Sequence, residues 1–278
     1  MEEKIIKYAL EEDFRYRGDI TSQAIFTAEK GEYKLVANDK GILCGSEYFC
    51  KVFAIVDEET RVKFLCHDGD EVFPKNRVAD INGKIQSILK AERVALNFLS
   101  HLSGIATKTH SFVKRLRGET KILDTRKTLP GLREAQKYAV ECGGGKNHRM
   151  GLYDLVMIKD NHIDGAGSIK KAVQKVKEKW GNKFKIEVET RNLEEVKEAL
   201  KSGADIIMVD NMKLDEMKKA VKIIGEKALS EASGNMTVDR IAAVSQIGVN
   251  YISVGALTHT VKAFDFSLVH AKEHYEFR

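Results

Sequence analysis

From Lys121 onward, short apolar segments alternate with amphipathic helical segments, and this alternation limits the possible folds more than any other feature. The apolar segments are KILDT, DLVMIKD, FKIEVET, ADIIMVDN, ALSEASG and YISVGAL. Helical stretches such as SIKKAVQKVKEKW, NLEEVKEALKSG and KLDEMKKAVKIIG lie between them. Alternating strands and helices predict a parallel sheet, either open or closed into a barrel. We count six βα units and allow for a seventh.

Polar residues follow every one of these predicted strands. They are Asp124, Arg126 and Lys127, then Lys159, Asp160 and Asn161, then Glu187 and Glu189, then Asp210 and Asn211, then Glu231 and Ser233, and finally Gly255 and His259. Strand carboxyl ends surround the active-site mouth of a barrel, whereas an open doubly wound sheet usually binds its ligand in one crevice. The distribution over all strands favours the barrel. The interval of roughly 160 residues is short for eight strands, so we predict an incomplete α/β barrel of about seven strands.

The first hundred residues have a different pattern, in which short apolar or alternating runs are separated by Gly, Asn and Asp turns. The predicted strand regions are YKLVAN, GILCG, RVKFLCHDGD and VADINGKIQSILK, and a helix is predicted over 91–116. We therefore predict an N-terminal α+β sandwich domain over 1–107, with the helix bridging to a barrel domain over 108–262. A C-terminal helix over 263–278 is expected to pack back on the N-terminal domain.

Composition narrows the class of protein. The 278 residues include 46 Lys and Arg against 41 Asp and Glu, and a net charge of +5 gives no general case for nucleic-acid binding. The four cysteines form no CxxC pair, which favours reduced thiols in a cytoplasmic protein. MEEKIIKYALEEDF predicts an acidic amphipathic helix rather than a signal peptide, and no apolar run is long enough to predict a membrane span.

Local charge is more informative than net charge. The interval from Lys121 to Arg149 contains LDTRKTLPGLR and has more Lys and Arg than carboxylates, which predicts a binding site for an anion. CGGGKN does not fit the phosphate-loop pattern, and GAGSIK lacks the third glycine of a dinucleotide-binding fingerprint. The cysteines and histidines have no zinc-site spacing.

The block from Leu123 to Ile163 closely resembles the quinolinate phosphoribosyltransferase family. The matching motifs run in order along nearly the whole chain: RGDIT, ERVALNFLSHLSGIAT, TRKTLPGLR, GGGKNHRMGL, IKDNH, EVET, MVDN, EASGN and VGALTH. A related family of molybdenum-transport-associated proteins shares TRKT and GGG-x-x-HR, but we expect that family to diverge at IKDNH. The resemblance implies a nicotinate-nucleotide diphosphorylase (carboxylating), a pentosyltransferase that joins quinolinate to phosphoribosyl pyrophosphate. The products would be nicotinate mononucleotide, pyrophosphate and CO2, in the de novo synthesis of NAD.

The resemblance also implies roles for single residues. Arg126, Arg149 and Lys159 would hold the two carboxylates of quinolinate, with His148 alongside, and Lys127 would bind phosphoribosyl pyrophosphate. Guanidinium groups suit this task because they match carboxylates with paired hydrogen bonds. Lys159 would also be catalytic, as a cation that positions the substrate during decarboxylation.

The late strand ends would bind the phosphoribosyl group. Glu189 and Asp210 would be catalytic, contacting the ribose hydroxyls and a Mg²⁺ cofactor that is held mostly through the substrate. The remaining implied substrate-binding residues are Ser233, Gly234, Gly255 and His259. Ser233 and the two glycines match the loops for the 5-phosphate, although Asn235 stands where some family members have a second glycine.

Arg93 matches a residue that family members insert into the site of the neighbouring subunit. The resemblance therefore implies a homodimer, with a hexamer of such dimers as the larger option, and neither a nucleic-acid nor a membrane partner.

Several residues keep two interpretations. Arg133 and Lys137 are either ligands or the solvated face of a helix, and His162 is either functional or a loop anchor. Glu187 lies on the same strand face as Glu189 and is a candidate core partner of a lysine. Asp124 is interpreted as structural.

Three other functions compete with the main one. The first is a related phosphoribosyltransferase acting on nicotinate or another anionic base, although the number of arginines favours a dicarboxylate. The second is an aldolase that forms a Schiff base at Lys159. The third is an anion-binding or nucleic-acid-binding module, which the position of the basic residues at strand ends disfavours.

Overall fold

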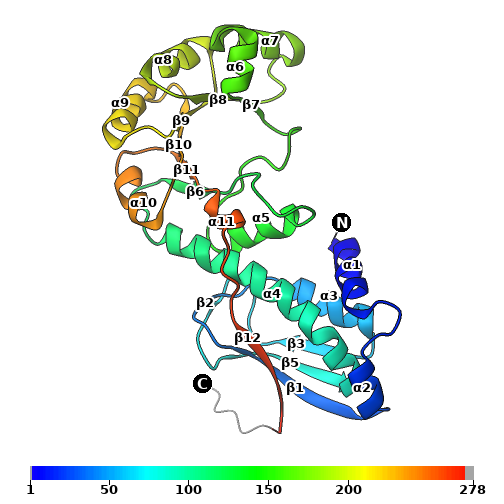
Figure 1. Cartoon of the computed structure of the whole chain (residues 1–278). Helices are drawn as coiled ribbons and strands as arrows, with labels where there is room; N and C mark the ends of the chain where they lie inside the picture. The colour runs from blue at the N-terminus through cyan, green and yellow to red at the C-terminus, as the bar shows by residue number, and fades with distance from the viewer. Residues whose placement is uncertain (1, 273–278) are drawn as a thin grey trace. The chain divides into compact units, whose positions relative to one another are not determined.

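The computed structural model describes residues 2–272, and these residues form two compact units (Figure 1). The N-terminal unit comprises the chain up to His110, the segment Thr128–Gly144 and the chain from Thr260 onward. The barrel unit comprises Ser111–Lys127 and Gly145–His259. The domain boundaries predicted from the sequence, after residues 107 and 262, lie close to these divisions. The prediction placed Thr128–Gly144 in the barrel domain, whereas in the structure this segment belongs to the N-terminal unit.

The N-terminal unit is built on a four-stranded antiparallel sheet in the order β12-β1-β5-β3. The strands are β1 (Lys30–Ala37), β3 (Arg61–Phe64), β5 (Arg77–Lys84) and β12 (Phe266–His270), and a small sheet pairs β2 (Gly41–Ile42) with β4 (Glu71–Val72). Leu35 lies opposite both Ala79 and Leu268 and is fully buried, so the middle of β1 forms part of the core. The helices of this unit are α1 (Glu2–Phe14), α2 (Ile20–Ile25), α3 (Ser46–Val56), most of α4 (Ile85–Val113) and α5 (Arg133–Cys142).

Two predicted elements of this unit are wrong. The C-terminal segment is the strand β12 and not a helix, because it completes the sheet by antiparallel pairing with β1, and residues 273–278 lie outside the described part. The segment VADINGKIQSILK, predicted as a strand region, is divided between β5 and α4, and its second half is helical. Helix α4 begins at Ile85 because its buried residues recur every three or four positions from there, at Ile88, Ala91, Ala95, Leu99 and Leu102.

The barrel unit is a six-stranded parallel sheet in the order β6-β11-β10-β9-β8-β7. The strands are β6 (Lys121–Leu123), β7 (Val156–Ile158), β8 (Ile186–Thr190), β9 (Ile206–Asp210), β10 (Leu229–Ser233) and β11 (Tyr251–Ser253). The helices are α6 (Asp160–Ala166), α7 (Ile169–Trp180), α8 (Leu193–Ser202), α9 (Leu214–Ile224), α10 (Val238–Ser245) and α11 (Ala256–His259). The strands form an arc, with α7, α8, α9 and α10 outside it (Figure 1).

The expected incomplete barrel is confirmed, but its sheet has six strands rather than about seven. The six strands are the six that the sequence predicts. Where a seventh would lie beyond β6, the described chain has one parallel bridge, between Leu123 and Lys146. Strands β6 and β7 are the two ends of the sheet order and do not pair, which leaves the barrel open there.

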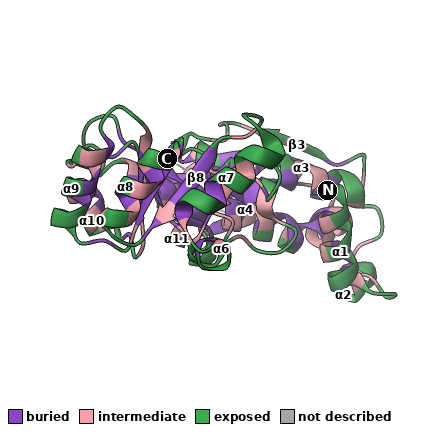
Figure 2. Cartoon of the chain, turned by 90° about the horizontal axis from the view of Figure 1, so that it is seen from above, coloured by how far each residue is buried: buried purple, intermediate pink, exposed green. Residues whose placement is uncertain are grey.

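Burial follows the amphipathic pattern of the helices. In Figure 2 the strand β8 is purple, meaning buried, while the outer turns of α7 and α9 are green, meaning exposed. Among the described helices, α2, α7 and α8 begin at a residue whose side chain caps the helix, such as Asn192, whose side chain accepts hydrogen bonds from the backbone of Glu194 and Glu195 at the start of α8. None of the described helices is both long enough and apolar enough to cross a membrane.

Candidate active site

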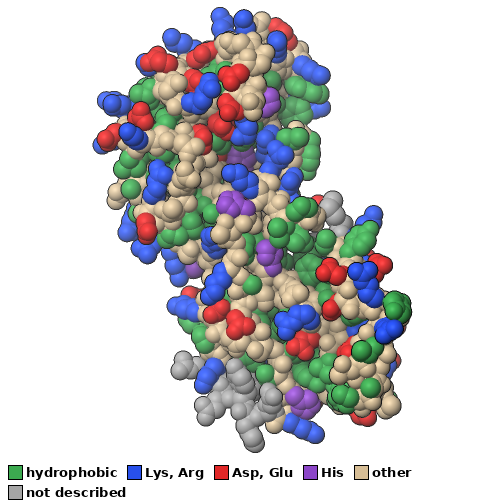
Figure 3. Space-filling view, viewed as in Figure 1, with side chains coloured by type: hydrophobic (Ala, Val, Ile, Leu, Met, Phe, Trp, Pro, Cys, Tyr) green, Lys and Arg blue, Asp and Glu red, His purple; other side chains and the backbone are tan. Residues whose placement is uncertain are grey.

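A cavity of about 790 Å³ opens at the carboxyl ends of the parallel strands. Its lining comes from the loops that follow β6 and β7, from the last residues of β8, β9 and β10, and from the turn after β11. Figure 3 shows Lys and Arg side chains (blue) gathered with His side chains (purple) on the same side of this unit. The barrel therefore presents a basic cavity where its strand ends converge.

Eleven of the twelve residues that the sequence predicts for the site line this cavity. They are Arg126, Lys127, His148, Arg149, Lys159, Glu189, Asp210, Ser233, Gly234, Gly255 and His259. The twelfth, Arg93, lines a separate cavity of about 310 Å³ in the N-terminal unit, together with residues of α1 and α4 such as Glu12, Asn97 and His101. Residues separated by more than a hundred positions are thus brought together by the barrel, and Arg93 is not among them.

Two guanidinium groups, those of Arg126 and Arg149, line this cavity close enough for their charges to interact. Burial lowers the pKa of Arg149, and the positive charge of Arg126 lowers it further. The Arg149 Nη1 donates to the carbonyl of Leu155 at 3.2 Å, which fixes the direction of its side chain. The buried Nε of Arg126 has no hydrogen-bond partner in the described chain. Like charges held together with an unused donor favour binding of an anion, because an anion removes both penalties.

Lys159 supplies a third cation to the cavity. It follows β7 directly and forms an ion pair with Glu189, whose side chain is mostly buried at the end of β8. The Lys159 backbone N–H donates to Nδ1 of His162 at 3.0 Å, within the first turn of α6. His162 is therefore a loop anchor, the second of its two interpretations, and it does not line the cavity.

Beneath the cavity floor, His148 lies against two buried glutamates. Its Nε2 is 3.0 Å from Oε2 of Glu187 in β8 and 3.5 Å from Oε2 of Glu231 in β10. The hydroxyl of Ser253 donates to the other oxygen of Glu231. Glu187 is therefore the partner of a histidine, and its interpretation as the partner of a lysine is wrong.

The backbone around His148 is fixed as well. Its N–H donates to Oδ1 of Asp124 at 2.9 Å, so Asp124 ties the end of β6 to the backbone of this segment. The N–H of Arg149 donates to Nδ1 of His148 at 2.7 Å. Because Nδ1 accepts, the ring proton lies on Nε2 and faces Glu187 and Glu231.

Protons are held tightly in this cluster. Burial by itself would lower the pKa of His148, but Glu187 and Glu231 outweigh it and raise the pKa to about 10. Burial and the charge of Glu231 raise the pKa of Glu187 to about 7, against the opposing effects of His148 and Arg149.

Close backbone turns shape the other wall of the cavity. Gly234, after β10, has a φ of +94°, and a Cβ there would lie 2.2 Å from Oδ1 of Asn211. The next residue, Asn235, has a φ of +46° and donates from Nδ2 to the same Asn211 oxygen at 3.3 Å. The loops after β9 and β10 are therefore packed directly against each other, which only a glycine at position 234 permits.

Helix N-termini complete that wall. Thr237, at the start of α10, lines the cavity and makes no side-chain capping hydrogen bond, so the first N–H groups of this helix remain available there. Gly255, before α11, leaves room for the Lys127 side chain, since a Cβ would lie 3.1 Å from Lys127 Cδ. Backbone N–H groups at helix starts suit a phosphate.

Sequence reasoning gave no role to several residues of the cavity and of the His148 cluster. It named Asn211 as a strand-end residue without a role, and it did not name Thr237, which lines the cavity at the start of α10. It noted Glu231 as a strand-end residue without giving it a role, and it passed over Ser253. The interpretation of Lys137 as part of a solvated face is wrong, since Lys137 is fully buried in α5. Arg133 donates to the hydroxyl of Thr128 at 3.1 Å.

Two family models match this chain. Residues 19–103 match "Quinolinate phosphoribosyl transferase, N-terminal domain" and residues 105–269 match the C-terminal domain of the same family. A relative from Bacillus subtilis, a probable nicotinate-nucleotide pyrophosphorylase [carboxylating], is 44% identical over 252 residues, covering 90% of this chain and 87% of the relative. The chloroplastic nicotinate-nucleotide pyrophosphorylase [carboxylating] of Arabidopsis thaliana is 44% identical over 95% of this chain and 81% of the relative.

The fold is similar to that of solved structures. The structure of the nicotinate-nucleotide pyrophosphorylase from Francisella tularensis matches with a TM-score of 0.94 and 42% identity, covering 97% of this chain and 95% of that one. The structure of the nicotinate-nucleotide pyrophosphorylase from Ehrlichia chaffeensis matches with a TM-score of 0.92 and 37% identity, covering 96% of this chain and 97% of that one.

Proposed function

The chain belongs to the quinolinate phosphoribosyltransferase family, and we propose how its own residues carry out the reaction of that family. The activity is that of a decarboxylating quinolinate phosphoribosyltransferase, or nicotinate-nucleotide diphosphorylase (carboxylating), in the de novo synthesis of NAD. Quinolinate and phosphoribosyl pyrophosphate are the substrates that the family implies.

Quinolinate binds where Arg126, Arg149 and Lys159 converge. The observation that carries this assignment is the pair of interacting guanidinium groups in the cavity lining, one of them with an unused buried donor. Two adjacent carboxylates on one ring match two adjacent guanidinium groups, each with paired hydrogen bonds. Lys159 reaches the same ligand by exchanging its ion pair with Glu189 for one with a substrate carboxylate.

Phosphoribosyl pyrophosphate binds along the opposite wall. Lys127 contacts the pyrophosphate, and the N–H groups at Gly234, Gly255 and the start of α10 hold the 5-phosphate. Ser233 and His259 line the same wall and add polar contacts. The ribose then lies between the two walls, beside Glu189 and Asp210.

A Mg²⁺ ion fits this site only together with substrate. Glu189 and Asp210 are two separate carboxylates at neighbouring strand ends, and neither belongs to a close group of three potential ligands among the described residues. Mg²⁺ usually takes one or two carboxylates and completes its shell with water and substrate oxygens. Bound in this way, it would neutralise charge on the departing pyrophosphate.

The transfer is an attack by the pyridine nitrogen on C1 of the ribose as pyrophosphate leaves. Positive charge develops on the ribose, and the carboxylates of Glu189 and Asp210 stabilise it. The ribosylated ring nitrogen is cationic, so the neighbouring carboxylate leaves as CO2 and the resulting ylide carbon takes a proton. Lys159 positions the ring during this step and forms no covalent bond.

The working unit is a homodimer in which Arg93 of each chain enters the site of its neighbour. Supporting this, Arg93 lines a cavity of the N-terminal unit and does not line the barrel cavity. We place the protein in the cytoplasm because its four cysteines form no disulfide.

The test is a comparison of two substrates. Purified protein is incubated with phosphoribosyl pyrophosphate, Mg²⁺ and either quinolinate or nicotinate, and nicotinate mononucleotide is followed by chromatography. Product from quinolinate alone is expected, with one CO2 for each nucleotide. Product from nicotinate alone would favour the related transferase acting on a monocarboxylate and would contradict the dicarboxylate assignment.

A further inference from the structure

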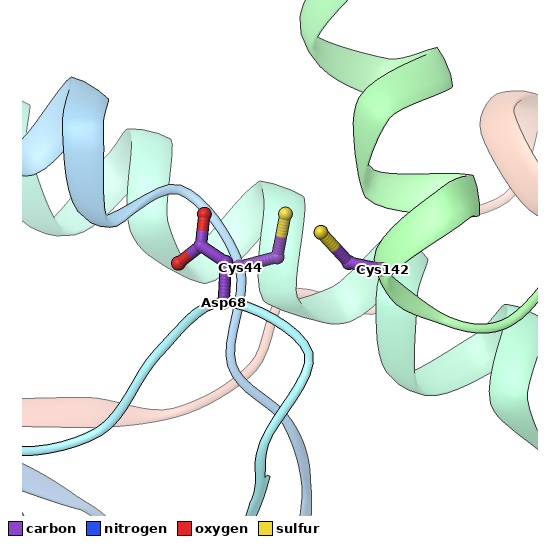
Figure 4. A group of neighbouring side chains, drawn as sticks. All are labelled: Cys44, Asp68 and Cys142. Carbon is purple, nitrogen blue, oxygen red and sulfur yellow. The ribbon is translucent and has the colours of Figure 1, made fainter.

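A second cluster of reactive side chains lies in the N-terminal unit, and none of its residues lines the barrel cavity. It consists of Cys44, after β2, Asp68, in the loop before β4, and Cys142, the last residue of α5 (Figure 4). The two sulfur atoms and a carboxylate oxygen all lie within 4.8 Å of one another. Figure 4 shows the two sulfur atoms side by side.

The fold itself holds the two cysteines together, because both are anchored to α4. The N–H of Cys44 donates to the hydroxyl of Ser103 at 2.9 Å, and that hydroxyl donates back to the carbonyl of Cys44 at 3.0 Å. Gly143, next to Cys142, packs so closely that a Cβ would lie 2.4 Å from the carbonyl of Ala106. The proximity of the thiols therefore does not depend on the conformation of a loop.

The cluster is not arranged as a metal cage. Both oxygens of Asp68 accept hydrogen bonds at the start of α3, from the N–H of Gly45 at 2.9 Å and from that of Ser46 at 3.1 Å. The hydroxyl of Tyr138 also donates to Asp68, at 3.2 Å. Because this carboxylate already has structural partners, the two thiols are the groups left to react.

The two thiols differ in the way that an attacking and a resolving cysteine differ. A hydrogen bond from the Cys44 thiol lowers the pKa of Cys142, in spite of partial burial and the charge of Asp68. The pKa values of the other three cysteines are raised: that of Cys44 by its hydrogen bond with Cys142 and by burial, and those of Cys50 and Cys66 mainly by burial, that of Cys66 to about 11. Cys142 is partly exposed and Cys44 is fully buried, so an oxidant in solution meets Cys142 first.

We propose that Cys142 and Cys44 form a reversible disulfide when the protein meets a peroxide. The Cys142 thiolate attacks one oxygen of hydrogen peroxide, giving a sulfenic acid and hydroxide. The Cys44 sulfur then attacks the Cys142 sulfur and displaces its oxygen as water, so two thiols and one peroxide give one disulfide and two waters. A dithiol reductant reverses the reaction.

The disulfide joins two distant parts of the chain. Residues 44 and 142 are far apart in sequence, so the bond closes a long loop and restricts the unfolded chain. It also fixes the end of α5, from which the chain continues through Gly143 and Gly144 toward Lys146, the residue that pairs with β6. We expect the oxidised protein to have a melting temperature about 5 °C higher than the reduced protein.

The experiment maps the thiols before and after treatment with hydrogen peroxide. Free thiols are alkylated under denaturing conditions, the protein is digested, and linked peptides are identified by mass spectrometry. A Cys44–Cys142 peptide that disappears on reduction is expected, while Cys50 and Cys66 remain alkylated as internal controls. Activity with quinolinate is measured separately, so this proposal stands or fails independently of the proposed function.

Variants separate the two roles. In Cys44→Ser, the Cys142 sulfenic acid should accumulate and react with dimedone, and in Cys142→Ser both products should be absent. The less buried Cys142 provides a second variant should Cys44→Ser fail to fold, and Cys50→Ser is the matched control that keeps the disulfide. Oxidation of wild-type Cys142 to sulfinic acid with Cys44 still alkylatable would overturn the proposal, as would equal linkage among all four cysteines.

Discussion

Lys159 is the cation whose two partners define its role. In the absence of substrate it is paired with Glu189, and in the proposed complex it holds a carboxylate of quinolinate. Replacing Lys159 by alanine removes a positioning charge and leaves Glu189 unneutralised beside the anionic substrates. We expect kcat/KM for quinolinate to fall about a hundredfold, measured by steady-state assay. Lys175→Ala, an exposed lysine of α7, is the control, and near-normal turnover of Lys159→Ala would remove Lys159 from the mechanism.

The cluster of His148, Glu187 and Glu231 predicts a pH dependence of stability. In this cluster the fold raises the pKa of His148 to about 10 and that of Glu187 to about 7. The folded cluster therefore binds protons more tightly than the unfolded chain. A raised pKa stabilises at low pH, and that contribution is lost as the pH rises through the folded value. The free energy of unfolding should therefore fall as the pH rises from about 4.5 to about 10, first through Glu187 and then through His148, by roughly 1–3 kcal/mol.

Urea unfolding at several pH values measures this loss. The fluorescence of Trp180, the single tryptophan, reports on the barrel unit, to which α7 belongs. Glu231→Gln removes one of the charges that raise the pKa of His148, so its stability should decline less over the same range. An identical decline in both proteins would show that other groups cause it.

At the scale of elements, the loop after β10 depends on one glycine. A side chain at position 234 would have to displace Asn211, whose backbone N lies 2.7 Å from the Cβ position, and would also adopt an unfavourable φ of +94°. Gly234→Ala should cost about 2 kcal/mol of stability and raise the KM for phosphoribosyl pyrophosphate about tenfold, because the phosphate loop moves. Denaturant unfolding and steady-state kinetics test both effects.

Gly225 offers a matched control within the same unit. It also has a positive φ, of +54°, at the end of α9, but a Cβ there would meet nothing within 4 Å. Gly225→Ala should therefore lose about 1 kcal/mol through backbone strain and keep its KM values. A rise in KM for Gly225→Ala equal to that for Gly234→Ala would mean that strain, and not the packing of two loops, sets substrate binding.

Elements were predictable where the signal is local. All six barrel strands and the helices α7, α8 and α9 follow from hydrophobic periodicity, and the polar residues at the strand ends pointed to the cavity. The strand β12 was missed because its partner β1 lies more than 200 residues away, and nothing local distinguishes such a strand from the end of a helix. Glu187 and Glu231 reach His148 from β8 and β10, a meeting set by sheet order that spacing along the chain does not show.

At the scale of the whole molecule, the chain is divided so that its predicted site residues lie in different units. Eleven of them line the barrel cavity, whereas Arg93 lies on α4 in the N-terminal unit. If Arg93 completes the site of a neighbouring chain, each site is made by residues of two copies of the protein. A copy that lacks one of its own cavity residues can then still donate Arg93 to the site of its neighbour.

This division predicts complementation between inactive variants. Arg93→Ala lacks the donated arginine and Lys159→Ala lacks its own pocket lysine, so each homodimer should be nearly inactive. In a mixed dimer, the intact pocket of the Arg93→Ala chain receives Arg93 from the Lys159→Ala chain, and one site of the two is complete. Random exchange makes half of the dimers mixed, so the mixture should recover about one quarter of wild-type activity.

The measurement is a steady-state assay after the two variants are denatured and refolded together, with each variant refolded alone as the control. If the mixture is no more active than each variant refolded alone, Arg93 does not act in the site of the neighbouring chain.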